Sequence, residues 1–315
     1  MVKLIASSVV RGAQQGQIHG GVYLIDFENQ QVNQTIDWNT SGIEWQGRGW
    51  DRGLRGIAFD EEHVFIAASD ELFQYTSDFE LIESWQNPYL KHCHEINIFN
   101  RTLYLTSTGF DSILGFDLDK RSFDWGMYLK REGIKYKPSI FDPKNQDGPM
   151  MLNKLHLNNV FCNGHGMYIS GLRSDGMLHF NGKSINMAVE LPAGTHNAQP
   201  FRDGVLFNDS EADLLRYTGR GEGEEDRAMH VPKYDEDKLT HMNIDKKLAR
   251  PGFARGLCEI SNSLVAGGSS PSTVTLYDLA KNKTLASVQL LSLIHISEPT
   301  RLRRISDAGL CVKKK

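Results

Sequence analysis

The sequence predicts an all-β fold, a six-bladed β-propeller made of four-stranded blades. Short runs that alternate apolar and polar residues fill the chain, separated by turns rich in Gly, Asp, Asn and Ser, and this pattern is typical of strands. Apolar residues at helical spacing are scarce. The alternating runs also recur as a unit of about 40 residues, which is the length of one propeller blade.

Five complete units can be aligned. Each reads as a first strand, a tight turn, a second strand that ends in small polar residues, and two further strands. The residue that opens the first strand is equivalent in all five; in chain order these residues are Arg55, His94, His156, His196 and Arg255. Two units are followed by about 20 extra residues. These insertions, 131–153 and 220–252, are expected between the last strand of one blade and the first strand of the next, on one rim.

The chain begins with a sixth unit, which shows only a second, third and fourth strand. Its first strand is expected from the other end of the chain, because a ring of blades closes when strands from both ends share one blade. Residues 1–290 therefore form a single propeller domain in this interpretation.

Residues 291–315 differ in character from the rest. The stretch LSLIHISEPTR, which starts at Leu291, resembles the translation of a sequencing adapter, and most of the residues after it match the adapter's continuation. We therefore expect that the native closing strand is lost and that 291–315 carries no evolved function. Because LSLIHISE alternates apolar and polar residues, Leu291–Glu298 is expected to serve as a surrogate first strand, with 301–315 outside the propeller.

Charge and composition exclude some partners. The formal net charge is −4, and residues 291–315 hold more basic than acidic side chains, so the remainder is more acidic still. An acidic chain without a clustered basic face is a poor candidate for nucleic-acid binding. The chain contains no run of about 18 apolar residues, so the sequence predicts no membrane-spanning helix. Four cysteines lie far apart without a CxxC pair, which favours a cytoplasmic protein with reduced thiols.

In its repeat pattern, the chain over about residues 3–290 resembles the gluconolactonase-like and NHL-type six-bladed propellers, and more closely still uncharacterised bacterial propellers. The resemblance implies a fold. Gluconolactonases hold a divalent ion with a carboxylate and amide side chains, and no matching positions occur in this sequence, so their activity is not carried over.

The repeated opening residues form the candidate site. First strands line the central channel of a propeller, so their opening residues lie at one rim. His94, His156 and His196 come from successive blades, and three neutral imidazoles on rigid strands suit Zn, Mn or Fe while leaving positions open for water or substrate. Asn97 and Asn159 are candidate supports. The structural alternative is that these histidines hydrogen-bond neighbouring blades and bind no metal.

Cationic and polar residues on the same rim indicate an anionic ligand. Arg55 and Arg255 carry guanidinium groups, which recognise carboxylate or phosphate through two parallel hydrogen bonds. The turns between second and third strands open on this rim as well. They supply further candidate substrate-binding residues: Asp111, Arg173 and Asn208.

Two functional hypotheses follow. The first is a metal-dependent enzyme, a hydrolase or lyase, that acts on a small anionic substrate such as a sugar acid or phosphorylated metabolite. In it, His94, His156 and His196 hold a divalent ion (Zn, Mn or Fe), and Arg55 and Arg255 clamp the anion. The alternative is a non-catalytic propeller that binds a small ligand or a protein partner through the same rim, without metal.

Overall fold

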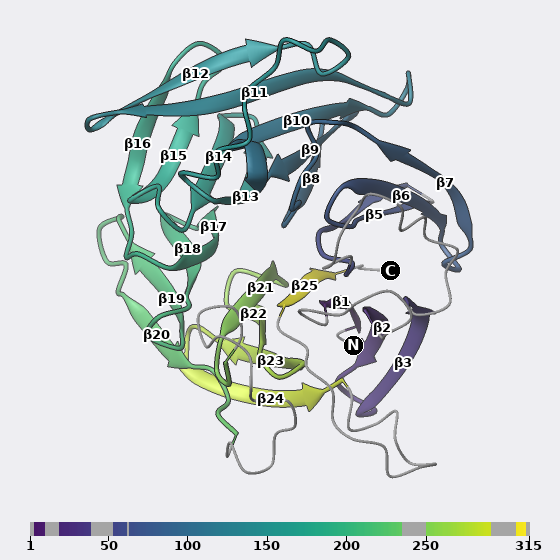
Figure 1. Cartoon of the computed structure of the whole chain (residues 1–315). Helices are drawn as coiled ribbons and strands as arrows, with labels where there is room; N and C mark the ends of the chain where they lie inside the picture. The colour runs from purple at the N-terminus through teal and green to yellow at the C-terminus, as the bar shows by residue number, and fades with distance from the viewer. Residues whose placement is uncertain are drawn as a thin grey trace. The chain divides into compact units, whose positions relative to one another are not determined.

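A computed structural model describes residues 3–9, 19–38, 53–61, 63–234 and 250–290, together with the backbone of 307–312. Its strands form six antiparallel sheets, five with four strands and one with five (Figure 1). Within the described ranges the helical structure is a single 3-10 turn, Thr108–Phe110. The fold is that of a six-bladed β-propeller, and the fold prediction is confirmed.

The chain divides into two compact units: unit 1, Met1–Arg55 with Asn208–Lys315, and unit 2, Gly56–Phe207. Unit 2 holds blades 2, 3 and 4 and the start of blade 5. Their strands are β4 (Ile57–Asp60), β5 (His63–Ala67), β6 (Glu71–Thr76), β7 (Leu81–Gln86), β8 (Ile96–Phe99), β9 (Thr102–Ser107), β10 (Ser112–Asp117), β11 (Ser122–Glu132), β12 (Lys135–Phe141), β13 (Leu157–Asn163), β14 (Gly166–Gly171), β15 (Gly176–Phe180), β16 (Ile185–Glu190) and β17 (Thr195–Phe201).

Blade 5 continues with β18 (Gly204–Asp209), β19 (Leu214–Gly219) and β20 (Arg227–His230). Unit 1 also contains blades 6 and 1. Blade 6 consists of β21 (Ala254–Glu259), β22 (Leu264–Ser269), β23 (Thr273–Asp278) and β24 (Lys283–Gln289). Blade 1 consists of β25 (Asp307–Val312), β1 (Lys3–Val9), β2 (Gly20–Asp26) and β3 (Gln31–Asp37).

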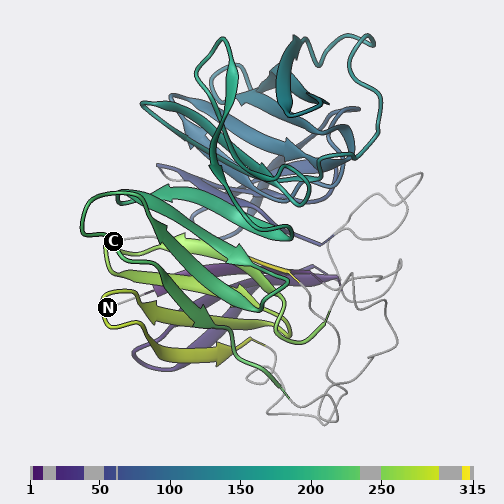
Figure 2. The ribbon, with the colours of Figure 1, turned by 90° about the vertical axis from the view of Figure 1, so that its left-hand side faces the viewer.

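The C-terminal strand of blade 1 comes from a different segment than the one predicted. β25 pairs antiparallel with β1, from Leu4 opposite Val312 to Val9 opposite Asp307, and the two strands lie side by side in Figures 1 and 2. The prediction that 301–315 lies outside the propeller is therefore wrong, because Asp307–Val312 occupies the free edge of β1. Leu291–Glu298 lies outside the described residues.

The insertions are partly built from strands. Within 131–153, the end of β11 and all of β12 form a hairpin, with register from Gly126 opposite Phe141 to Glu132 opposite Lys135. β12 thus adds a fifth strand to blade 3. Within 220–252, β20 supplies the fourth strand of blade 5, and 235–249 lies outside the described residues.

Apolar side chains pack between neighbouring blades. In unit 2, one buried cluster joins β5 and β6 to β8–β11 and includes Phe65, Leu103 and Phe116. A second cluster joins β10–β12 to β13–β16. In unit 1, Tyr23 and Ile25 of β2 pack against Val274 and Leu276 of β23. The inward residues of each sheet therefore bury their area against the next blade, which is the main source of stability.

The small polar residues at the ends of second strands bind the backbone where the next blade begins. Ser7 Oγ donates to Arg55 O, Thr108 Oγ1 to Leu157 O at 2.5 Å, and Ser210 Oγ to Ala254 O at 2.7 Å. Each acceptor lies at, or within one residue of, the aligned position that opens a first strand. Ser7, Thr108 and Ser210 are fully buried, and a buried hydroxyl needs a hydrogen-bond partner, which the carbonyls at the blade junctions provide.

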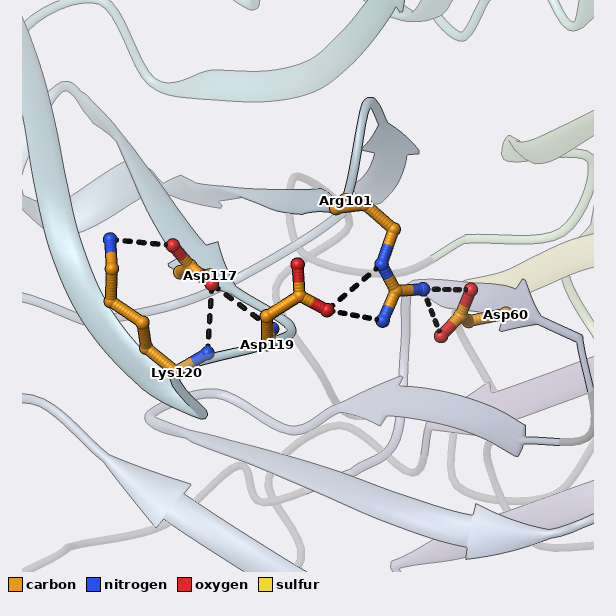
Figure 3. A network of polar contacts seen from close by, with 5 residues as sticks. All are labelled: Asp60, Arg101, Asp117, Asp119 and Lys120. Carbon is orange, nitrogen blue, oxygen red and sulfur yellow. Dashed lines mark hydrogen bonds and ion pairs between the residues drawn. The ribbon is translucent and has the colours of Figure 1, made fainter.

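An exposed ion network crosses from blade 2 to blade 3 (Figure 3). The Arg101 guanidinium binds both oxygens of Asp60, at 2.8 and 2.9 Å, and Asp119 at 2.8 Å. Lys120 binds Asp117 at 2.7 Å. The hydrogen bonds with Asp119 and Asp60 raise the pKa of Arg101.

Candidate functional site

The residues predicted to open the first strands lie at these openings. Arg55 and His94 each lie two residues before a strand, and His156 lies one residue before β13. His196 and Arg255 are the second residues of β17 and β21. The three histidines belong to unit 2 and the two arginines to unit 1. That all five face one channel mouth stays a prediction.

His94 is fixed through its Nδ1 nitrogen. Nδ1 lies 2.7 Å from His92 O and 2.8 Å from Thr108 Oγ1. The carbonyl can only accept, and the Thr108 hydroxyl already donates to Leu157 O. The proton of a neutral His94 imidazole is therefore on Nδ1, which leaves the lone pair on Nε2.

His156 is held in the same way. Its Nδ1 lies 3.0 Å from Asn153 Oδ1. Arg173 lies behind Asn153: its guanidinium donates to Asn153 O at 2.5 Å and contacts Asn153 Oδ1 at 3.4 Å. Because the arginine identifies that amide atom as oxygen, His156 also carries its proton on Nδ1 and its lone pair on Nε2.

The structure brings two of the three histidines together. The rings of His94 and His156 are 5.4 Å apart between centroids, at an interplanar angle of 64°. Two imidazoles that share one ion, with N–metal distances of about 2.1 Å, place their ring centres about 5 Å apart. His196 is buried, and its Nδ1 lies 2.9 Å from Gly194 O. Across the described ranges, no group of three His, Cys, Asp or Glu side chains is arranged to hold a metal ion.

The backbone around these histidines is strained. Four non-glycine residues beside or among these histidines have positive φ, as do residues in turns elsewhere in the described chain: His92 at 56°, Asn153 at 47°, His156 at 55° and Asn197 at 54°. An L-residue in this region costs free energy, and such residues often mark binding sites, where the surrounding structure holds them.

Sequence reasoning missed Glu95. Its Oε1 accepts a hydrogen bond of 2.8 Å from Asn197 Nδ2, 102 residues away. This bond therefore joins the residue that follows His94 to the residue that follows His196. Its position directly after His94 was the only signal in the sequence.

The two asparagines predicted as supports do tie first strands together. Asn97 Oδ1 accepts from Cys162 N at 3.0 Å, which joins β8 to β13. Asn159 Nδ2 donates to Ala198 O at 2.7 Å, which joins β13 to β17. These bonds hold the strands that carry the three histidines in a fixed relation.

The predicted substrate-binding residues all have structural partners. Asp111 accepts backbone N–H groups from Lys154, Leu155 and His156, at 2.5, 3.0 and 2.9 Å. Burial raises the pKa of Asp111. Arg173 binds backbone carbonyls at Lys154 and Asn153. In unit 1, Asn208 Nδ2 donates to Gly256 O at 3.1 Å.

The arginines of unit 1 are buried. Arg55 is 3% exposed and Arg255 is 8% exposed. The Arg255 guanidinium carbon lies 4.3 Å from the centre of the Phe253 ring, a cation–π arrangement that lowers the cost of burying the charge. Both guanidinium groups are therefore buried at first-strand openings, and their role as a clamp for an anion stays a prediction.

No protein-family model matches the chain, and no curated protein is similar to it. Several solved structures share its fold. A nidogen/laminin complex aligns at 10% identity with a TM-score of 0.58 and 98% coverage of both chains. A protein of unknown function from Bacteroides caccae aligns at 9% identity with a TM-score of 0.58 and full coverage of both chains. At these identities the similarity establishes the β-propeller fold alone.

Proposed function

We propose that the protein acts on a small anionic substrate with a divalent metal ion bound by the histidines that open its first strands. The observation that supports this most directly is the shared tautomer. In His94, His156 and His196 an oxygen atom accepts the Nδ1 proton. Metal-binding histidines commonly donate one ring N–H to an oxygen atom in this way, which orients the ring and directs the other nitrogen at the ion.

His94 and His156 are the two ligands whose spacing suits one ion. The third proposed protein ligand is His196, the second residue of β17 in the next blade. An ion held by two or three imidazoles keeps positions open, and it would polarise a substrate oxygen or lower the pKa of a bound water.

The chain's own residues prepare the site for this chemistry. The Arg173–Asn153 contact fixes the amide oxygen that holds His156 Nδ1, so the ring presents Nε2 to an ion. Arg55 and Arg255 remain the proposed clamp for a carboxylate or phosphate group. A sugar acid or a phosphorylated metabolite fits this combination, in a hydrolase or lyase reaction.

A second candidate function is non-catalytic binding of a small ligand or protein partner through the same residues. It is favoured by one observation, that no three-ligand group is gathered within the part of the chain that the structure describes. The gluconolactonase-like resemblance does not separate the two, since it concerns the fold. A cytoplasmic location, suggested by the widely spaced cysteines, is part of both proposals. Within the described residues no helix is long and apolar enough to cross a membrane.

Metal analysis separates the candidates. The protein is incubated with Zn, Mn or Fe(II) and then desalted. The metal that stays bound is measured by inductively coupled plasma mass spectrometry. The wild type is expected to retain one ion per chain. The double variant His94→Ala/His156→Ala is expected to lose it, whereas His165→Ala, an exposed histidine in the β13–β14 turn, should keep it.

The outcomes are distinct. Full metal retention by the triple variant lacking His94, His156 and His196 would contradict the proposed site. A wild type that takes up no ion, but loses binding of an anionic ligand in the same variants, would establish the second candidate instead.

A further inference from the structure

A cavity of about 410 Å³ lies in unit 2 beside β11. Its lining includes Lys154 and Leu155, which directly precede His156, but neither His94 nor His156 itself. Its walls come from the 3-10 turn, the second half of β11 and the segment 148–155. Its lining includes Leu129, Lys130, Met150, Leu152, Lys154 and Leu155. A volume of this size is typical of small-molecule sites.

The cavity has an apolar floor and an apolar rim. Leu129 and Leu155 are 4% and 3% exposed and belong to the buried cluster between blades 3 and 4. At the rim, Met150 is 76% exposed and Leu152 is 55% exposed. Exposed large apolar side chains that continue into a concave apolar surface are typical of ligand sites, and methionine adapts its shape readily to a bound molecule.

Two of the charged lining residues are neutralised by partners outside the cavity. Arg131 pairs with Asp175 at 2.6 Å, and Glu132 pairs with Lys137 at 2.5 Å. The third, Asp111, holds its three backbone N–H groups.

Two lysines remain. Lys130 and Lys154 line the cavity and make no ion pair with any residue that the structure describes. The Lys130 ammonium lies 5.1 Å from the centre of the Tyr128 ring, another lining residue. Two cationic groups thus stand at an apolar cavity whose other charges are balanced.

We propose that this cavity binds an amphiphilic carboxylate, a molecule with an apolar chain and one carboxylate group. The chain would lie on Leu129 and Leu155 beneath Met150 and Leu152, and the carboxylate would bind Lys130 and Lys154. A charge-assisted bond to an ammonium group is stronger than one between neutral groups. A cationic amphiphile is repelled by the same lysines, and a purely apolar molecule leaves them unused.

Decanoate is a suitable probe, measured by isothermal titration calorimetry on the full chain. It should bind saturably with one site per chain. Lys130→Gln/Lys154→Gln should weaken binding by about tenfold or more, because each lysine supplies a charge-assisted hydrogen bond. Met150→Glu should weaken it similarly by placing a like charge on the rim. The matched control is Lys144→Gln, an exposed lysine four residues before the segment 148–155 that does not line the cavity.

Decanamide and decylammonium test the charge requirement, and both should bind at least about tenfold more weakly than decanoate. Equal binding of decylammonium, unchanged affinity in the double lysine variant, or no saturable decanoate binding would each overturn the proposal. The His94→Ala/His156→Ala variant should bind decanoate like the wild type, which keeps this inference independent of the proposed metal site.

Discussion

Replacing Asp111 by alanine is expected to destabilise unit 2 and to loosen the segment that leads to His156. The carboxylate accepts three backbone N–H groups, those of Lys154, Leu155 and His156. Asp111 is 5% exposed and Leu155 is 3% exposed, so water cannot easily replace the lost acceptor.

The size of the effect follows from these contacts. A hydrogen bond to a charged group contributes about 1.5 to 3 kcal/mol, and a buried donor left without an acceptor costs a similar amount. With one N–H fully buried and two nearer the surface, Asp111→Ala should lower the free energy of unfolding by about 3 to 5 kcal/mol. At about 2 to 4 °C per kcal/mol, the melting temperature should fall by about 10 °C.

The assay is thermal unfolding followed by circular dichroism, together with hydrogen exchange of the segment 153–157. Asp111→Asn should lose about half as much stability, because the amide oxygen still accepts from Leu155 and His156 while its NH2 group faces the Lys154 N–H. The control is Asp142→Ala, which removes an exposed carboxylate that accepts from Lys144 N. If Asp111→Ala melts within about a degree of this control, with unchanged exchange, the clamp described for Asp111 is refuted.

Three further perturbations test other parts of the structure. The hydrogen bond with Lys120 lowers the pKa of Asp117 from 3.8 to about 2. Because the folded-state pKa is lowered, the ionised carboxylate stabilises the fold above pH 3.8, and this stabilisation is lost as the pH falls towards 2. In urea titrations, Asp117→Asn should therefore be less stable than the wild type at about pH 5 and equal to it near pH 2. Thr108→Val should lower the melting temperature by a few degrees through the lost hydroxyl bond, about 1 kcal/mol, and reduce metal retention by removing an acceptor of His94 Nδ1. Deleting 291–315 removes β25 and leaves the edge of β1 unpaired, so light scattering should detect more aggregation; an unchanged melting temperature and a monodisperse product would instead favour the adapter interpretation.

The blade pattern was predictable because it is local. Alternation with period two, turn residues and a unit of about 40 residues are written directly in the chain, and the first strands begin at or within two residues of the aligned positions. The identity of the closing strand was not predictable. Strand pairing is made by backbone groups, so segments without a clear alternating pattern can also occupy a free edge, and Asp307–Val312 does so in this structure.

The sequence by itself determined the propeller class, the place of the three histidines at equivalent strand openings, and the need for polar residues at the ends of second strands. Only the tertiary structure decided which side chains meet: the 5.4 Å approach of His94 and His156 and the bond from Asn197 to Glu95. The reason is physical. Periodicity reports the face on which a side chain lies, whereas contact between distant strands depends on interblade packing, which no single segment encodes.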